Sequence, residues 1–176
     1  MALTITVAPT IDLPAPVRHE LLTLCSVAYE MEFSPYLEML GNGLHILGWA
    51  EERLVSHAAI ITRTLEVDHR ISLHTGYVEA VATLPRAQGQ GFATAIMQEV
   101  AAQLDAYAIG ALSPSDVGFY ARLGWEPWRG PLLVRTEQGE EPSPEDEEVM
   151  ILRCAKTPPL RLDHPLSVEW RPLEIW

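Results

Sequence analysis

The stretch GYVEAVATLPRAQGQGFATAIMQEV, residues 76–100, decides how the rest of the chain is interpreted. Residues 77–83 are rich in small and β-branched side chains and Pro85 follows them, which predicts a mostly buried strand. Two glycines, Gly89 and Gly91, then precede an alanine-rich segment that predicts a helix over residues 91–105. We therefore expect a strand, a glycine-containing loop and a helix in direct succession.

One residue of the predicted strand breaks its apolar pattern. Side chains alternate along a strand, so Glu79 should share a face with Tyr77, Val81 and Thr83. Desolvation raises the pKa of a carboxyl group, and a carboxylate with a raised pKa suits general-base catalysis. Glu79 is therefore the candidate base on this strand, and the alternative is a carboxylate that is merely exposed or paired.

The glycine loop has two interpretations. Glycine allows backbone conformations and close approaches that other residues do not allow. Amides in such a loop, together with the first unpaired amides of a helix, can bind an anion such as a pyrophosphate. The other interpretation is a tight connection between strand and helix.

Three motifs in order carry a resemblance. Gln88-x-x-Gly91-x-Ala93 directly after a Val-Ala-Thr strand resembles the coenzyme A pyrophosphate signature of the GNAT N-acetyltransferases. Gly110-Ala-Leu-Ser113 reads as the following strand, and Tyr120-x-x-x-Gly124-Trp125 resembles the family's helix end. More narrowly, four segments are similar to the aminoglycoside 2′-N-acetyltransferases: residues 76–79, residues 124–131, the acidic segment before Val149, and residues 170–176. That similarity covers nearly the whole chain.

The resemblance implies a fold of the α/β (α+β) class. In this GNAT fold a central mixed, mostly antiparallel sheet with splayed central strands is flanked by helices. The length of 176 residues fits one domain, so we expect a single GNAT acetyltransferase domain over residues 1–176.

The implied activity is the transfer of an acetyl group from acetyl-CoA to the 2′-amine of an aminoglycoside antibiotic, which would make the protein a resistance enzyme. A close alternative is acetylation of the 2′-amine of kasugamycin. Two alternatives belong to other classes: a protein or peptide N-acetyltransferase, and a non-catalytic acyl-CoA-binding module. The acidic tail favours a cationic small substrate over a peptide, and Glu79 together with Tyr120 argues against a binding module.

The resemblance also implies roles for individual residues. Glu79 would act as general base through a water molecule, Tyr120 would act as general acid, and the terminal carboxylate of Trp176 would belong to the catalytic site. Coenzyme binding falls on Val81, Ala82, Thr83, Arg86, Gln88, Gly89, Gln90, Gly91, Phe92 and Ala93, and substrate binding on Glu32, Glu38, Glu79, Ser113, Glu145, Asp146, Glu174 and Trp176. Many relatives have arginine where this chain has Gln88, so the phosphate site should depend more on backbone amides and on Arg86.

Charge and hydropathy exclude several classes of partner. Twelve Lys and Arg against 24 Asp and Glu give a net charge of −12, which argues against nucleic acid and anionic membranes and favours a cationic partner. No apolar run approaches the roughly 20 residues that span a bilayer. The first residues also lack the features of a secretory signal, so we expect a cytoplasmic protein, and a homodimer is possible.

The cysteines and histidines do not form a metal-binding pattern. Cys25 and Cys154 are far apart, and neither belongs to a CxxC motif or to a His/Cys cluster at metal spacing, so we expect reduced thiols, direct acetyl transfer and no metal. His57 and His74 lie on predicted strands, where hydrogen-bonded structural histidines are expected more often than catalytic bases.

The remaining elements follow from local patterns. Before the deciding stretch we expect a strand at residues 4–7, a helix that starts near Asp12, irregular structure over residues 31–43, and an antiparallel meander of residues 44–49, 54–65 and 71–83. After it we expect a strand at 108–112, a short helix capped by Ser115 or Asp116 and ended by Gly124, a solvated acidic loop at 137–148, and a strand at 149–152. The tryptophan at position 176 should anchor the tail to the protein.

Overall fold

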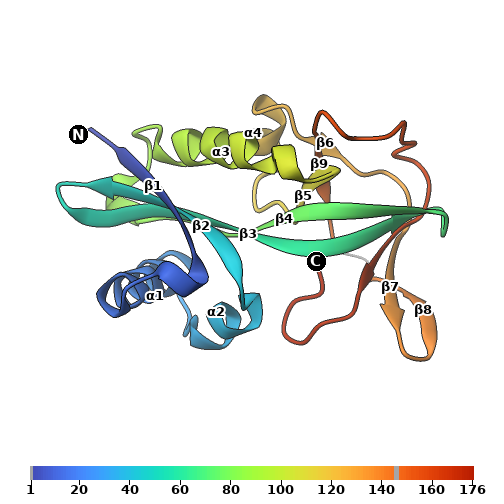
Figure 1. Ribbon diagram of the computed structural model, residues 1–176, viewed down its shortest axis with the longest axis horizontal. Coiled ribbons are helices and arrows are strands. Elements are labelled where there is room, and N and C mark those ends of the chain that lie inside the picture. Colours follow the sequence, from blue (N-terminus) through green and yellow to red (C-terminus); the bar gives the residue numbers. More distant parts are fainter. Residues whose placement is uncertain (1, 145–146) are drawn as a thin grey trace. The chain divides into compact units, whose positions relative to one another are not determined.

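The computed structural model describes residues 2–144 and 147–176. These residues form two compact units (Figure 1). The first unit contains the chain up to Ile61 together with Val78–Ala102, and the second contains Thr62–Tyr77 together with Gln103–Trp176. Two long strands, β3 (Arg53–Val67) and β4 (Ile71–Thr83), run through both units. That the whole chain acts as one domain stays a prediction.

The first unit is built on an antiparallel arrangement of β1 (Thr4–Pro9), β2 (Gly43–Ala50) and the first part of β3. Its helices are η1 (Thr10–Asp12), α1 (Ala15–Tyr29), α2 (Ser34–Leu40), η2 (Pro85–Ala87) and α3 (Phe92–Gln103). In Figure 1, α1 and α2 lie on one side of these strands and α3 lies on the other. The unit therefore has three layers, with its strands between α1 and α2 on one side and α3 on the other.

The helices begin and end where local chemistry favours it. Pro14 occupies the N-cap of α1, and the helix ends at Glu30, which has the left-handed φ of 54° common at helix ends. The prediction of irregular structure over residues 31–43 is wrong for α2. Pro35 lies in its first turn, where a missing N–H is tolerated, and Gly41, with φ 59°, ends it.

The second unit holds a mixed sheet with the strand order β6-β9-β5-β4-β3-β10-β7-β8. The strands not yet introduced are β5 (Ile109–Leu112), β6 (Glu126–Pro127), β7 (Leu132–Thr136), β8 (Gly139–Pro142), β9 (Met150–Arg153) and β10 (Leu166–Glu169). Strand β4 pairs with β5, and β10 with β7, in parallel, whereas the pairs β5–β9, β6–β9, β7–β8 and β3–β10 are antiparallel. The expected mixed, mostly antiparallel sheet flanked by helices is confirmed.

Two short helices complete this unit, η3 (Leu104–Ala106) and α4 (Val117–Arg122). The carboxylate of Asp116 accepts from the amide of Phe119 at 3.0 Å, so the predicted cap of α4 is Asp116 rather than Ser115. Gly124 follows the helix with φ 90°, as expected for a C-terminal glycine.

Part of the acidic segment is ordered as a strand. Residues 139–142 form β8, which is exposed along its length and pairs with β7 as a hairpin. The prediction of a solvated loop is therefore right about the exposure of residues 137–142 and wrong about the absence of a strand at residues 139–142. Among the described residues, no helix has both the length and the apolar character needed to cross a bilayer.

Candidate functional site

The glycine loop is anchored at both ends and open in between. Ala87 and Phe92 are buried and pack with Ala50 and Val55, whereas residues 88–91 are exposed. The loop is therefore a defined turn held by the core of the first unit, with its middle presented to solvent.

Both glycines of the loop have backbone conformations that favour glycine. Gly89 has φ 73° and Gly91 has φ 81°, and no described atom lies within 4 Å of the place where a Cβ would stand on either residue. The first bond into α3 runs from the amide of Ala95 to the carbonyl of Gly91 at 3.0 Å. The helix amides before Ala95 have no acceptor within the helix, so they and the open glycines fit a pyrophosphate at the positive end of the helix dipole.

The polar side chains of the loop bind mainly to the loop itself. Gln88 donates from its backbone amide to the carbonyl of Pro85 and from its side chain to the carbonyl of Thr83, both at 3.3 Å. Gln90 donates to the carbonyl of Arg86 at 3.4 Å. These glutamines stabilise the turn, which leaves the guanidinium of Arg86, an exposed residue, as the cationic side chain of residues 84–93.

The strand before the loop, β4, contains one residue with an unusual backbone conformation, Ala80. This alanine has φ 51°, a left-handed conformation that costs a non-glycine residue about 1–3 kcal/mol. Leu73, Thr75, Tyr77 and Val78 are buried before it, Ala80 itself is buried, and Ala82 is buried after it. The strict alternation that put Glu79 on one face with Val81 and Thr83 is therefore broken at Ala80. Glu79 itself is half-buried, immediately before the left-handed residue.

Side chains hold three successive carbonyls after this point. The ring of His57 bonds the carbonyl of Ala80 at 2.9 Å. The hydroxyl of Tyr29 donates to the carbonyl of Val81 at 3.1 Å, and the hydroxyl of Ser56 donates to the carbonyl of Ala82 at 3.2 Å. Sequence reasoning identified His57 as structural, which is confirmed, but it missed Tyr29 and Ser56 because their contacts depend on the pairing of distant segments.

The two acids predicted near α2 differ in their surroundings. The carboxylate of Glu32 accepts from the hydroxyl and from the backbone amide of Ser34, and these bonds lower its pKa. Glu32 therefore helps to start α2. Glu38 lines a cavity of about 600 Å³ between η1, α1, α2 and β2, where Arg18 and His45 also lie.

In the second unit, Tyr120 is a buried aromatic residue of α4. Its ring meets the rings of Phe119 and Trp125 edge to face. Burial raises the pKa of its hydroxyl, although a hydrogen bond with Ser115 opposes that rise. A phenol with a raised pKa stays protonated at neutral pH, as a general acid must. Ser113 follows β5 directly and is half-buried.

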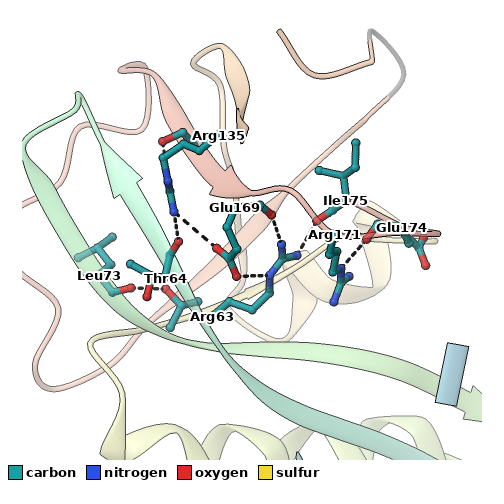
Figure 2. A network of polar contacts seen from close by, with 10 residues as sticks. Arg63, Thr64, Leu73, Arg135, Glu169, Arg171, Glu174 and Ile175 are labelled. Carbon is teal, nitrogen blue, oxygen red and sulfur yellow. Dashed lines mark hydrogen bonds and ion pairs between the residues drawn. The ribbon is translucent and has the colours of Figure 1, made fainter. Parts of the chain in front are cut away.

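The tail of the second unit is held firmly. The indole of Trp176 is buried and its Nε1 donates to the hydroxyl of Ser143 at 2.7 Å, so the expected anchor is confirmed. Arg171 donates to the carbonyl of Glu174, and Figure 2 shows both in the polar network of Arg63. Glu174 is exposed overall, yet partial burial of its carboxyl raises its pKa, which Arg171 opposes. Glu145 and Asp146 lie outside the described residues.

The cysteines are free, as predicted. Burial raises the pKa of the Cys25 thiol to about 12 and also raises the pKa of Cys154, so neither is a thiolate at neutral pH. The described residues contain no group of three or more His, Cys, Asp or Glu side chains that could hold a metal ion.

The candidate residues fall into two groups by unit. Glu79, the glycine loop, Glu32 and Glu38 belong to the first unit, and Ser113, Tyr120, Glu174 and Trp176 belong to the second. Within the first unit, Glu79, the left-handed Ala80 and the glycine loop follow one another along one short stretch of chain. This stretch combines a carboxylate, turned backbone amides and the exposed amino-terminal end of α3.

Comparison with known proteins places this arrangement in a family. Residues 18–128 match the family described as acetyltransferase (GNAT) domain. The chain is 36% identical over 175 residues to an aminoglycoside 2′-N-acetyltransferase of Mycolicibacterium fortuitum, a match that covers 95% of this chain and 89% of that protein.

Solved structures agree at the level of the fold. The Escherichia coli GNAT family N-acetyltransferase YhbS, determined in complex with CoA, has a TM-score of 0.62 at 18% identity, with 97% of this chain and 92% of that chain covered. An acyl-CoA N-acyltransferase of Pseudomonas aeruginosa has the same TM-score at 17% identity, with 85% and 99% covered. The family match spans more than half of the chain and includes the strand, the glycine loop and α3. The chain therefore belongs to the GNAT family of acetyltransferases.

Proposed function

We propose that this protein transfers the acetyl group of acetyl-CoA to the 2′-amine of an aminoglycoside. The observation that carries the proposal is the 36% identity to an aminoglycoside 2′-N-acetyltransferase over 95% of this chain. The net charge of −12 supports the same conclusion, because an aminoglycoside is a polycation that such a protein attracts.

The coenzyme would be held by backbone groups. The amides of Gly89, Gln90 and Gly91 and of the first turn of α3 are suited to the pyrophosphate, with Arg86 as the cationic side chain. Phe92, Ala93 and the strand residues Val81, Ala82 and Thr83 would complete the binding surface. Acetyl-CoA supplies an acetyl group activated as a thioester. The chain's own task is to orient that group beside the amine.

Glu79 would accept, through a water molecule, the proton that the attacking amine loses as the amide bond forms. The backbone amide of Val81, just after the left-handed Ala80, would polarise the thioester carbonyl. Tyr120 would donate its proton to the sulfur as the carbon–sulfur bond breaks, which its raised pKa supports. Proton and leaving group are then both accounted for within this chain.

Acidic groups would bind the cationic substrate. Glu38 and Glu32 in the first unit and Glu174 and Trp176 in the second are the described candidates, with Ser113 as a neutral hydrogen-bonding partner. Each charge-assisted hydrogen bond to an ammonium group contributes about 1.5–3 kcal/mol before solvent exposure weakens it. The carboxylate of Trp176, a cytoplasmic location and a homodimer stay predictions.

The proposal is tested by measuring release of free CoA thiol with a panel of acceptors. The panel contains aminoglycosides with a free 2′-amine, matched aminoglycosides that carry a hydroxyl at that position, kasugamycin, polyamines and basic peptides. We expect turnover with the 2′-amino compounds at kcat/KM values at least about 100-fold above those of the 2′-hydroxy compounds. Turnover restricted to kasugamycin or to peptides would replace the proposal with that alternative. Acetyl-CoA binding without turnover of any amine would indicate a binding module.

A further inference from the structure

A chain of hydrogen bonds in the first unit ends on the left-handed alanine. His57 Nδ1 lies 2.9 Å from the carbonyl oxygen of Ala80, and His57 Nε2 lies 3.0 Å from Nδ1 of His45. Nε2 of His45 in turn lies 2.9 Å from the hydroxyl of Thr10, which accepts from the amide of Gly43 at 2.9 Å. His57 is completely buried and His45 is almost so.

The carbonyl of Ala80 fixes the tautomer of both histidines. A carbonyl oxygen only accepts, so Nδ1 of His57 must carry hydrogen and its Nε2 must accept. Nδ1 of His45 therefore donates, and its Nε2 is an acceptor. The single hydroxyl hydrogen of Thr10 is shared between this ring nitrogen, at 2.9 Å, and the carbonyl of Gly43, at 3.1 Å. Burial lowers the pKa of His57 to about 3 and that of His45 to about 4, so both rings are neutral at neutral pH, as this pattern requires.

Holding the Ala80 carbonyl also aims the next amide. The carbonyl of Ala80 and the N–H of Val81 belong to one planar, trans peptide group, so the two bonds point in opposite directions. A ring nitrogen that fixes the carbonyl on one side therefore fixes the N–H of Val81 on the other side. Tyr29 and Ser56 fix the next two carbonyls in the same way, so the direction of each amide here is set by a side chain.

We propose that His57 is a positioning residue for acetyl transfer: by holding the Ala80 carbonyl it aims the Val81 amide at the thioester carbonyl, and His45 keeps the His57 ring in the required tautomer. This inference rests on the proposed role of Val81 in acetyl transfer, but it does not depend on which amine is acetylated. The histidine pair touches no reacting atom. Its effect should appear in the chemical step rather than in coenzyme binding.

Two amide substitutions of nearly equal polarity separate this role from packing. The nitrogen of asparagine can occupy the place of the ring Nδ1, whereas that of glutamine can occupy the place of Nε2. His57→Asn therefore keeps a donor for Ala80, and His57→Gln keeps the contact with His45 but loses that donor. His74, an exposed histidine on β4 that stacks on Tyr107, provides the control His74→Asn.

The direct measurement is the infrared stretching frequency of acetyl-CoA labelled with ¹³C at the thioester carbonyl and bound to each variant. No acceptor amine is needed. We expect the wild-type protein, His57→Asn and His74→Asn to lower this frequency relative to free acetyl-CoA, because a hydrogen-bond donor polarises the carbonyl. His57→Gln should bind acetyl-CoA with an affinity within about 3-fold of wild type and show a smaller decrease. Its kcat should fall at least about 10-fold, with His57→Asn losing less.

An equal decrease of the carbonyl frequency in His57→Gln and His57→Asn would overturn the proposal. It would also be overturned if both variants lost kcat only in proportion to their loss of folding stability. Should His57→Gln fail to fold, His45→Gln removes the Nδ1 donor to His57 one step further back, and an unchanged carbonyl frequency in that variant would overturn the role of His45. Failure of the proposed substrate appears differently: the wild-type protein would polarise the carbonyl of bound acetyl-CoA and yet acetylate no aminoglycoside.

Discussion

The side chain of Arg63 is buried, and its Nε lies 3.0 Å from Oε1 of Glu169 (Figure 2). The same guanidinium donates to the backbone carbonyls of Glu169 and Ile175, at 2.7 Å and 2.5 Å. One buried cation thus ties β3 to β10 and to the residue before Trp176. This fixes the segment that carries Glu174.

Replacing Arg63 should loosen the tail. Arg63→Met keeps much of the length of the side chain but leaves two carbonyls and a carboxylate without their donor, so we expect a loss of roughly 2–4 kcal/mol in the free energy of unfolding. Urea unfolding measures this loss, and hydrogen exchange should show faster exchange over residues 170–176. Arg161→Met, which removes an exposed ion pair with Asp163, is the control and should change neither. Equal protection of residues 170–176 in both variants would contradict the anchoring role.

The glycine loop gives a prediction with a closely matched control. A Cβ at Gly91 meets no described atom within 4 Å, and the same holds at Gly139 in the β7–β8 turn, and both residues have positive φ. Gly91→Ala and Gly139→Ala therefore both place an alanine at a strained positive φ, of 81° and 128°. Only the first should weaken acetyl-CoA binding, by about 10-fold or more, because its methyl group occupies the space a pyrophosphate needs. Titration calorimetry measures the acetyl-CoA affinity of both variants. Equal affinities would show that the loop only connects the strand to the helix.

Glu79→Gln should separate chemistry from binding. The amide keeps the shape of the side chain and cannot accept the amine proton, so kcat should fall by about 10²- to 10⁴-fold while acetyl-CoA affinity stays within about 3-fold. Full activity of this variant between pH 6 and 8 would rule out Glu79 as the base.

The buried histidine pair predicts a specific sensitivity to acid. Burial lowers the pKa of His45 to about 4 and that of His57 to about 3, so the folded protein resists protonation that the unfolded chain accepts near pH 6.5. Their stabilising contribution is complete above pH 6.5 and is lost as the pH falls toward 4, with a slope approaching about 1.4 kcal/mol per pH unit for each ring. Urea unfolding of wild type and His57→Asn at pH 7, 6 and 5 measures the difference. If the free energy of unfolding changed with pH by the same amount in wild type and in His57→Asn, these pKa values would be contradicted.

Much of the fold could be predicted because local signals agreed with one another. The stretch from β4 to α3 carries a β-branched run, a proline, two glycines and an alanine-rich segment, and each signal predicts the same boundary. The strand β10 was not predicted, because its four residues lie among prolines and gain their pairing only from β3 and β7, which are distant in sequence. Short strands of this kind depend on tertiary partners that no local pattern contains.

The candidate site was predictable in its residue types and not in its supporting contacts. Glu79 and the glycines stand out in the sequence because each breaks the pattern around it. The left-handed Ala80 does not stand out, since alanine has no preference for positive φ. The carbonyls of Ala80, Val81 and Ala82 are bonded by His57, Tyr29 and Ser56. Such bonds join residues 23 to 52 positions apart, so they require the folded protein.

The position of the new amide tests the central claim most directly. The protein is incubated with acetyl-CoA labelled with ¹³C at the acetyl carbonyl and with an aminoglycoside that carries amino groups at the 2′ position and elsewhere. The product is then examined by carbon–proton correlation NMR. We predict one acetylated product, in which the labelled carbonyl correlates with the amide proton on the 2′ nitrogen. A product acetylated at another amine, or no acetylated aminoglycoside while the protein consumes acetyl-CoA with kasugamycin or a peptide, would contradict the proposed function.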